Sequence, residues 1–577
     1  MPVDPATVLW ERRLSAGHYL AACRILNTCP PLLQDALAAR YASIAEPVRR
    51  HWAVGDGRVA DSWGEAYRDL RAIGAELRQV RPDTAYDDDA IEHAADRAAR
   101  FCMACRTHAA AVEYAERQGM TLPSGPRVTV RSIRRRLDSP DWWRRMLRRR
   151  LTRACEELFR RLGFVRAQAS AYVSGDALAR IRAARRKGQH WLDEMLAVCQ
   201  DTGESIPLAK IAAGSLANPT LRRGELMVRA RGFQEVAESN GHRCLMVTLT
   251  CPSAFHPWLH SGERNERFNG ATPRAAQAWL NKHWARARAA FKKRGVLCYG
   301  FRAAEPHHDG TPHWHAVLYV PPADLWRVRV ILRKVWLKDY RDEPGALRHR
   351  VKFTVEDPAK GSGVGYLAKY VAKNIDGAGA MGGEVSDESG RPMSDDAEAA
   401  VAWARLHGIR QFQQIGGPAV TLWRELRRVR EPCEWPPIEA LRLTTDHTDN
   451  GGPSWAAFVR ELGGIAAALR ASRALFDKAE PRCIDSMGRK VLRLTRWGEF
   501  PAPMVIGVQL IWRDRIRRLA TRVHVWFLVF APPRGALTLG PVAITVAGAA
   551  RLNEPASWTN PHESSQAPPR RVRRTPP

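Results

Sequence analysis

Acidic residues are scarce in this sequence relative to basic ones. Among 577 residues, 60 are Asp or Glu and 90 are Lys or Arg, which gives a formal net charge of +30 and a pI near 10.4. A chain with this excess of positive charge is expected to bind a polyanion. The sequence has no amphipathic stretch of the lipid-anchoring kind, so we expect nucleic acid as the partner and no membrane.

Long hydrophobic runs are also missing. The apolar run VHVWFLVF at residues 523–530 is too short to cross a bilayer and is followed by Pro532, Pro533 and Arg534, so we predict a buried strand. The N-terminal residues MPVDPATVLWERR are charged before any apolar run develops, which argues against a secretory signal peptide. We therefore expect a cytoplasmic protein.

Cysteine is sparse and unevenly placed. The chain has 11 cysteines, an odd number scattered without a disulfide pattern, which favours reduced thiols. Cys102 and Cys105 form the only CxxC pair, with His108 three residues later, but no second pair follows at the spacing of a zinc ribbon or finger. We predict packing thiols on a helix, with a zinc site as the alternative.

The length and the 45% hydrophobic content predict several packed regions. We divide the chain into an Ala-rich helical N-terminal region (1–125), a basic helical region (126–235), a central domain (236–430) and a C-terminal region with a disordered basic tail (431–577). The glycine-rich and then acidic residues 376–398 are expected to form a mobile loop.

The stretch EPHHDGTPHWHAVLY, residues 305–319, carries the first candidate site. His313 and His315 are separated by one residue, so on a strand both imidazoles point to the same face. Residues 299–305 also have strand character, and the Asp-Gly and Pro between the two segments indicate a turn. An antiparallel hairpin would place Glu305 beside His313.

Two imidazoles and one carboxylate make three protein ligands. Such a set leaves coordination positions open for a substrate oxygen or for water, as a catalytic metal site requires. By ligand type alone, two imidazoles favour Mn²⁺ or Zn²⁺. His307 and His308 are either solvated turn residues or alternative ligands.

The second candidate site is GSGVGYLAKYVAKN, residues 361–374, which we predict to become a helix after its glycines. Tyr366 and Tyr370 are four residues apart, so both phenols lie on one helical face, roughly 5 to 6 Å apart at Cβ. Lys369 and Lys373 each follow a tyrosine by three residues and repeat one local arrangement. A phenol has a pKa near 10, and a nucleophilic tyrosine needs nearby positive charge. Ordinary aromatic packing is the alternative.

Arginine is dense in residues 127–166, and acidic partners are too few there to neutralise it. We predict a helix after Asp138 or Ser139 with Pro140 in its first turn, and a second basic helix at residues 175–192. Arginines suit phosphate contacts and tryptophans suit stacking on bases, so we favour DNA binding over a solvated charged face. The residues expected to contact DNA are Arg134, Arg135, Arg136, Trp142, Trp143, Arg144, Arg145, Arg148 and Arg149.

The central domain alternates strand and helix signals. In CLMVTLT, Leu245, Val247 and Leu249 form an apolar face, and the threonines on the other face would lie beside the site. A helix with N-cap Thr272 and a C-terminal stop at Gly295 follows, then the hairpin, a helix at residues 324–340, a strand at 351–355 and the tyrosine helix. This order predicts an α+β fold, an antiparallel sheet with helices packed on one side.

Together these stretches resemble the bacteriophage replication gene A proteins, which are two-tyrosine HUH endonucleases that initiate rolling-circle replication. CLMVTLTCPSAFHP (244–257) resembles the first motif of that family, EPHHDGTPHWHAVL (305–318) its metal motif and GYLAKYVAKNIDG (365–377) its nucleophile motif. IRQFQQIGGPAVTLWRELRR (409–428) resembles the block that follows. The resemblance covers about residues 236–430. It implies an α+β HUH domain with metal ligands on its central strands, and Mg²⁺ or Mn²⁺ as cofactor.

The resemblance also implies an activity, site-specific single-strand DNA cleavage and strand transfer. A metal on Glu305, His313 and His315 would bind the scissile phosphate, and Tyr366 or Tyr370 would form a 5′-phosphotyrosine, leaving a 3′-hydroxyl that primes synthesis. The other tyrosine would cleave the regenerated junction so that the strand is rejoined. We expect this to occur at a phage or prophage origin in the cytoplasm of a bacterial host.

The sequence has no GxxxxGK[ST] loop, so we expect a host helicase to unwind the DNA and a host polymerase to extend it. An HUH transposase or relaxase would share the same chemistry on another substrate. A non-catalytic DNA-binding protein would need only the basic helices. These two remain as alternatives.

Overall fold

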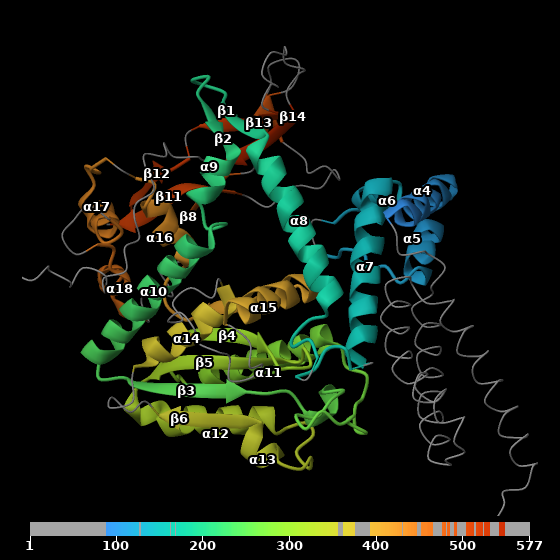
Figure 1. Ribbon diagram of the computed structural model, residues 1–577. Coiled ribbons are helices and arrows are strands. Elements are labelled where there is room, and N and C mark those ends of the chain that lie inside the picture. Colours follow the sequence, from blue (N-terminus) through green and yellow to red (C-terminus); the bar gives the residue numbers. More distant parts are fainter. Residues whose placement is uncertain are drawn as a thin grey trace, which may run out of the picture.

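Figure 1 shows the computed structural model of the chain. It describes residues 88–547 with the exception of 126–127, 162, 168, 356–361, 376–392, 430, 447–451, 466–475, 480–481, 485–489, 493–503, 513–514, 523 and 531–541. The expected mobile loop lies mostly, and the basic tail entirely, outside the described residues. Most of the N-terminal region, residues 1–87, also lies outside them.

A five-stranded antiparallel sheet forms the centre of the molecule, with strand order β6-β3-β5-β4-β7. The strands are β3 (Arg243–Leu249), β4 (Tyr299–Pro306), β5 (Pro312–Val320), β6 (Val351–Val355) and β7 (Phe412–Ile415). Four of these were predicted from the sequence. The edge strand β7 was not, because FQQI has no clear alternation of apolar and polar residues.

Helices cover both faces of this sheet. Leu245, Trp314 and Leu318 point to one face, where they pack in a core with α11 (Pro273–Lys293) and α12 (Leu325–Trp336). Val317 and Tyr319 point to the other face and pack in a second core. That core includes α10 (Pro219–Ser239) and α14 (Gly363–Ile375). The expectation of helices on one side only was therefore wrong, because β4 and β5 carry buried side chains at successive positions and not only at alternate ones.

Helix α11 begins and ends as its sequence predicts. The Thr272 side chain accepts a hydrogen bond from the backbone N–H of Ala275 at 3.2 Å, Pro273 is the first helical residue, and Gly295 lies just beyond the helix at φ +65°. Helix α12 ends at Trp336, four residues before the predicted end. Both helices therefore present an apolar stripe to the sheet.

Helix α14 approaches the sheet closely at its first turn. Ser362 caps the helix, because its hydroxyl accepts from the N–H of Gly365 at 3.1 Å. A β-carbon on Gly363 would lie 2.6 Å from the sulfur of Cys244 on β3, so only glycine allows this approach. The glycines thus serve the start of a helix, as expected, and bring its tyrosines over the sheet.

The described part of the two N-terminal regions is helical as far as Asp193; beyond it the second region also contains two short strands, Met195–Cys199 and Ser205–Pro207, which the expectation of a helical region did not include. The helices as far as Asp193 are α4 (Asp88–Ala104), α5 (His108–Arg117), α6 (Val130–Leu137), α7 (Pro140–Arg161) and α8 (Gly175–Asp193). Helices α4 to α7 share a small hydrophobic core. Figure 1 shows α7 running from this core to the central sheet, with α8 beside it.

Residues far apart in sequence form a second, smaller sheet. β13 (Val525–Phe530) pairs with β1 (Met195–Cys199), which pairs with β2 (Ser205–Pro207), and β14 (Val542–Ala547) lies outside β13. The predicted buried strand at 523–530 is confirmed as β13, with Trp526 and Leu528 buried but Phe530 exposed. In the described parts of the chain, no helix combines the length and the apolar character needed to cross a membrane.

The remaining elements include the strands of two further sheets. These elements are α9 (Leu208–Ala213), α13 (Ala346–His349), α15 (Met393–His407), α16 (Val420–Leu426), α17 (Pro436–Leu443), α18 (Trp455–Glu461), β8 (Phe476–Ala479), β9 (Arg482–Ile484), β10 (Lys490–Leu492), β11 (Met504–Trp512) and β12 (Arg515–Ala520), with single 3₁₀ turns at Ser253–Phe255 and Pro322–Asp324. One of the two sheets has the order β12-β11-β8, and the other pairs β10 with β9.

Candidate active site

The β4–β5 hairpin brings Glu305, His313 and His315 together, as the sequence predicts. Glu305 is directly opposite His313 in the ladder. The Nε2 atoms of the two histidines are 2.8 Å apart, and His315 Nε2 is 3.8 Å from the Glu305 carboxylate. One ligand atom from each residue lies within 4.8 Å of the others, so a single ion can contact all three.

Burial favours the neutral form of the candidate ligand His313. The side chain is almost fully buried, and burial together with the neighbouring His307 and His315 lowers its pKa well below the ordinary value. A neutral imidazole keeps a lone pair for a metal. The ring of His307 stacks on that of His313 at 3.9 Å, while His308 lies next to His260.

Two residues of the tyrosine helix α14 contact the Glu305 carboxylate. Its carboxylate is 1% exposed, lies 3.8 Å from the ammonium of Lys373, and accepts a hydrogen bond from the side chain of Asn374. Asn374 was missed in the sequence, where it is only the residue after the second lysine. Lys373 is buried and Lys369 is exposed, so the sequence repeat YLAK and YVAK does not produce two equivalent lysines.

Both tyrosines contact the same metal-ligand candidate, His315. The Tyr366 hydroxyl is 3.1 Å from His315 Nδ1, and the Tyr370 ring stacks on the imidazole with centroids 4.1 Å apart and planes at 16°. The two phenol rings are 4.9 Å apart. Thr248 on β3 also reaches His315 Nδ1, at 3.3 Å, which confirms a threonine beside the site. The predicted convergence of metal strand and tyrosine helix is therefore present.

The turn between β4 and β5 is fixed by donors from three other parts of the chain. Three consecutive carbonyl oxygens accept these hydrogen bonds: His308 from Tyr172 N–H at 3.2 Å, Asp309 from Arg160 Nε at 2.8 Å, and Gly310 from Trp403 Nε1 at 2.8 Å. These three hydrogen bonds hold in place the ends of both strands that carry the candidate metal ligands.

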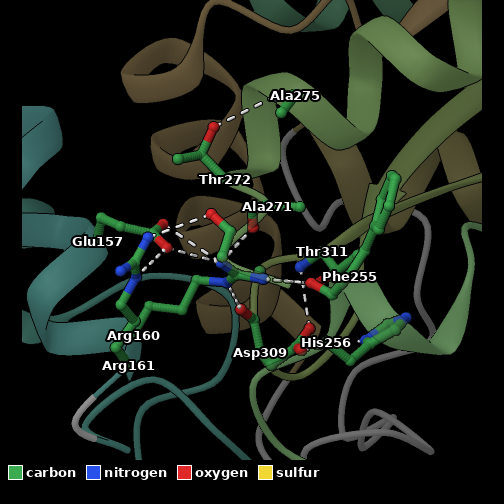
Figure 2. Close-up of polar contacts among 12 residues, drawn as sticks. Glu157, Arg160, Arg161, Phe255, His256, Ala271, Thr272, Ala275, Asp309 and Thr311 are labelled. Atoms are coloured by element: carbon green, nitrogen blue, oxygen red, sulfur yellow. Dashed lines mark hydrogen bonds and ion pairs between the residues drawn. The ribbon is translucent and has the colours of Figure 1, made fainter. Parts of the chain in front are cut away.

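Arg160, from the last turn of α7, is the centre of this arrangement (Figure 2). Its guanidinium is almost fully buried and pairs with Glu157 at 3.1 Å. It also donates to Phe255 O at 2.8 Å, Ala271 O at 2.9 Å and the Thr311 hydroxyl at 2.9 Å. No signal in the sequence separates Arg160 from the other arginines of the basic segment.

The carboxylate of Asp309 organises the same turn from inside. It accepts from the N–H of Thr311 at 2.9 Å and contacts Nδ1 of His256 at 3.0 Å. Burial alone would raise the pKa of Asp309, but the charges of His256 and Arg160 outweigh it and hold that pKa far below its usual range. Asp309 therefore stays ionised as a buried anchor.

Comparison with known proteins decides the family. The model of the family described as bacteriophage replication gene A protein (GPA) matches residues 66–378, more than half of the chain, and includes Glu305, His313, His315, Tyr366 and Tyr370. The chain belongs to this family.

Three relatives illustrate the extent of the likeness. The replication gene A protein of Escherichia phage 186 is 40% identical over 326 residues, which are 56% of this chain and 46% of that protein. The replication protein of Haemophilus phage HP1 is 42% identical over 51% of this chain and 38% of its own length. A probable replication endonuclease from a prophage-like region of Salmonella typhimurium is 38% identical over 50% of this chain and 35% of its own length. The match thus spans about half or less of these curated relatives. No solved structure matches the chain.

The basic segment of this gene A family member contains core residues as well as exposed arginines. Trp142 is 6% exposed and Trp143 is 0% exposed, and the Trp143 indole donates to Leu137 O at 2.7 Å. The expectation that these tryptophans stack on DNA bases was therefore wrong. Their spacing on α7 places them against α4 to α6, because a tryptophan on a short helical bundle gains more from burial than from exposure.

Several of the predicted DNA-binding arginines also have partners within the protein. Arg134 donates to backbone oxygens at the end of α4, Arg136 is buried and donates to Ser132 O, and Arg144 pairs with Asp141 at 2.6 Å. Four arginines of the set are exposed: Arg135, Arg145, Arg148 and Arg149. These four keep DNA binding as a prediction.

The CxxC pair lies in the N-terminal helical core. Cys102 is buried, which raises the pKa of its thiol to about 12, and Cys105 donates from its sulfur to Phe101 O at 3.3 Å. Both positions suit packing thiols.

Proposed function

We propose that this chain is an HUH-type DNA nicking endonuclease and strand transferase that initiates rolling-circle replication of a phage or prophage. The observation that carries the proposal is the contact of two tyrosines, from one helical face, with the imidazole of His315 in a three-residue ligand set. Membership of the gene A family, and the replication endonuclease names of relatives, support the same conclusion.

The residues of the site fit a divalent metal. The facing Nε2 atoms of His313 and His315 are 2.8 Å apart, and one cation could contact both imidazoles and the Glu305 carboxylate. Glu305, His313 and His315 would hold the ion. A bound Mg²⁺ or Mn²⁺ would supply Lewis-acid stabilisation of charge on the scissile phosphate.

The tyrosine hydroxyls act as nucleophiles. When His315 uses Nε2 as a ligand, its Nδ1 carries the proton and donates it in a hydrogen bond to the Tyr366 oxygen 3.1 Å away, which favours the phenolate. The phenolate oxygen forms a bond to phosphorus and the bond from phosphorus to the 3′-oxygen breaks. The products are a 5′-phosphotyrosine and a free 3′-hydroxyl once the leaving oxygen is protonated.

The second tyrosine allows the strand to be rejoined. Tyr370 cleaves the regenerated junction by the same substitution, and the new 3′-hydroxyl attacks the first phosphotyrosine, which restores the phenol and closes the DNA circle. No bond energy is lost to hydrolysis. In this scheme DNA is the substrate, and a host helicase and a host polymerase unwind and extend it.

Single and double tyrosine variants test the proposal. A tiled set of single-stranded oligonucleotides covering the replicon that encodes the chain is incubated with the protein and Mn²⁺. Covalent complexes are then resolved on denaturing gels. We expect Tyr366→Phe and Tyr370→Phe each to keep part of the covalent attachment and the double variant to lose it.

Tyr340→Phe is the control, because Tyr340 is an exposed tyrosine after α12 on the opposite face of the sheet. It should leave attachment unchanged. Undiminished attachment in the double variant would contradict the proposal.

A further inference from the structure

A second cluster of metal-ligating side chains lies where β1 meets β13, outside the site described above. Cys199 is paired with Trp526 in this ladder. Asp201 lies two residues after Cys199 and His524 two residues before Trp526, so the antiparallel register sets Asp201 opposite His524 on the side of Cys199. Cys199 and His524, which are 325 residues apart in the sequence, therefore lie together at one end of the strand pair.

The three ligand atoms are close enough for one ion. His524 Nδ1 is 3.2 Å from the Asp201 carboxylate, and the sulfur, oxygen and nitrogen all lie within 4.8 Å of one another. Among the described residues, only this cluster and the Glu305 set bring three such atoms together. Asp201 and His524 are exposed, so an ion can enter from solvent.

Backbone hydrogen bonds close the turn after Cys199. The N–H of Cys199 donates to Glu204 O at 2.8 Å, and Gly203, at φ +68°, donates to Cys199 O at 3.0 Å. The backbone positions of Cys199 and Asp201 are therefore fixed relative to each other.

We propose that Cys199, Asp201 and His524 bind one zinc ion. Thiolate, imidazole and carboxylate are the three ligand types that zinc takes in proteins, whereas a thiolate disfavours Mg²⁺ and Ca²⁺. The set supplies two negative charges and one neutral nitrogen, which suits a divalent ion in a chain of net positive charge. A water molecule completes the tetrahedron.

The ion fastens the strand that follows basic helix α8 to a strand of the C-terminal region. Helix α8 ends at Asp193 and β1 begins at Met195, so the proposed zinc site lies at the end of the short strand that follows this helix. This site is independent of DNA cleavage.

Cobalt replaces zinc as a spectroscopic probe in the test. The full-length protein is titrated with Co²⁺ and the near-ultraviolet band from thiolate-to-cobalt charge transfer is measured. The Glu305 site has no sulfur and gives no such band. We expect one equivalent of cobalt to produce the band and Zn²⁺ to displace it.

Three variants decide the assignment. Cys199→Ser should abolish the band, and Asp201→Asn, an exposed change that leaves the strand intact, should weaken binding at least about tenfold. Cys105→Ser, in the CxxC pair, should have no effect. Absence of the band in the wild-type protein, or its persistence in Cys199→Ser, would overturn the proposal.

Discussion

Replacing Arg160 by methionine should loosen the turn that carries the metal ligands. The change keeps most of the side-chain volume but removes the Arg160 donors to Asp309 O, Ala271 O and the Thr311 hydroxyl, and leaves Phe255 O with only the Thr311 hydroxyl as a donor. Each buried acceptor left without a donor costs about 1 to 3 kcal/mol, and removing one partner of a buried ion pair costs about 3 to 5 kcal/mol. These terms overlap and are not additive, so we expect a loss of about 4 kcal/mol.

Hydrogen exchange at the turn measures this loss locally. The amides of His307 and Gly310 donate within the turn, and Thr311 N–H donates to the Asp309 carboxylate. A loss of about 4 kcal/mol corresponds to roughly a thousandfold faster exchange of these amides, and DNA nicking should fall with it. Arg149→Met is the control for the exchange rates alone, because Arg149 is an exposed arginine of the same helix that is expected to contact DNA. Turn amides that exchange within about tenfold of the wild-type rate would refute the reasoning.

Three further predictions concern other parts of the fold. Burial raises the pKa of Glu156 to about 7, so between pH 4.5 and 7 the native state binds a proton that the unfolded state does not. The free energy of unfolding therefore falls as pH rises through this window. In Glu156→Gln, urea unfolding should no longer show this pH dependence. In Gly363→Ala, the new β-carbon would clash with the sulfur of Cys244, so the tyrosine helix should be displaced and nicking reduced. In Gly365→Ala, the β-carbon meets nothing closer than 3.5 Å, so thermal unfolding should show a helix stabilised by up to about 1 kcal/mol. Equal effects of the two variants would contradict this. Trp143→Ala should cost about 3 to 5 kcal/mol of stability, measured by calorimetry, without weakening DNA binding by the folded protein. Arg149→Ala should leave stability unchanged and weaken DNA binding, measured by DNA titration at fixed salt.

The parts of the site that depend on local sequence could be predicted from it. The register of Glu305 opposite His313 follows from a short turn between two strands, and the shared face of Tyr366 and Tyr370 follows from helical spacing. The family motifs then indicated that the strand pair and the helix meet. The predicted α+β fold with an antiparallel sheet is also confirmed, because the order of strands and helices could be predicted from local sequence patterns.

The parts of the fold and the site that depend on contacts between distant residues could not be predicted from the sequence. Arg160 is one arginine among many until its neighbours from residues 255, 271 and 309–311 are in place. Strand β7 is added to the sheet edge by tertiary pairing with β4. Trp142 and Trp143 looked suited to DNA because arginines surround them, but helical periodicity turns both indoles into the core of α4 to α7. The boundaries drawn between the four regions stay predictions.

The most direct test of the proposed chemistry identifies the residue that becomes attached to DNA. The protein is trapped on a nicked single-stranded oligonucleotide, digested with trypsin and nuclease, and the modified peptide is sequenced by mass spectrometry. We predict a nucleotide joined through its 5′-phosphate to the phenol oxygen of Tyr366 or Tyr370. An adduct on any other residue, or cleavage with no adduct at all, would contradict the account.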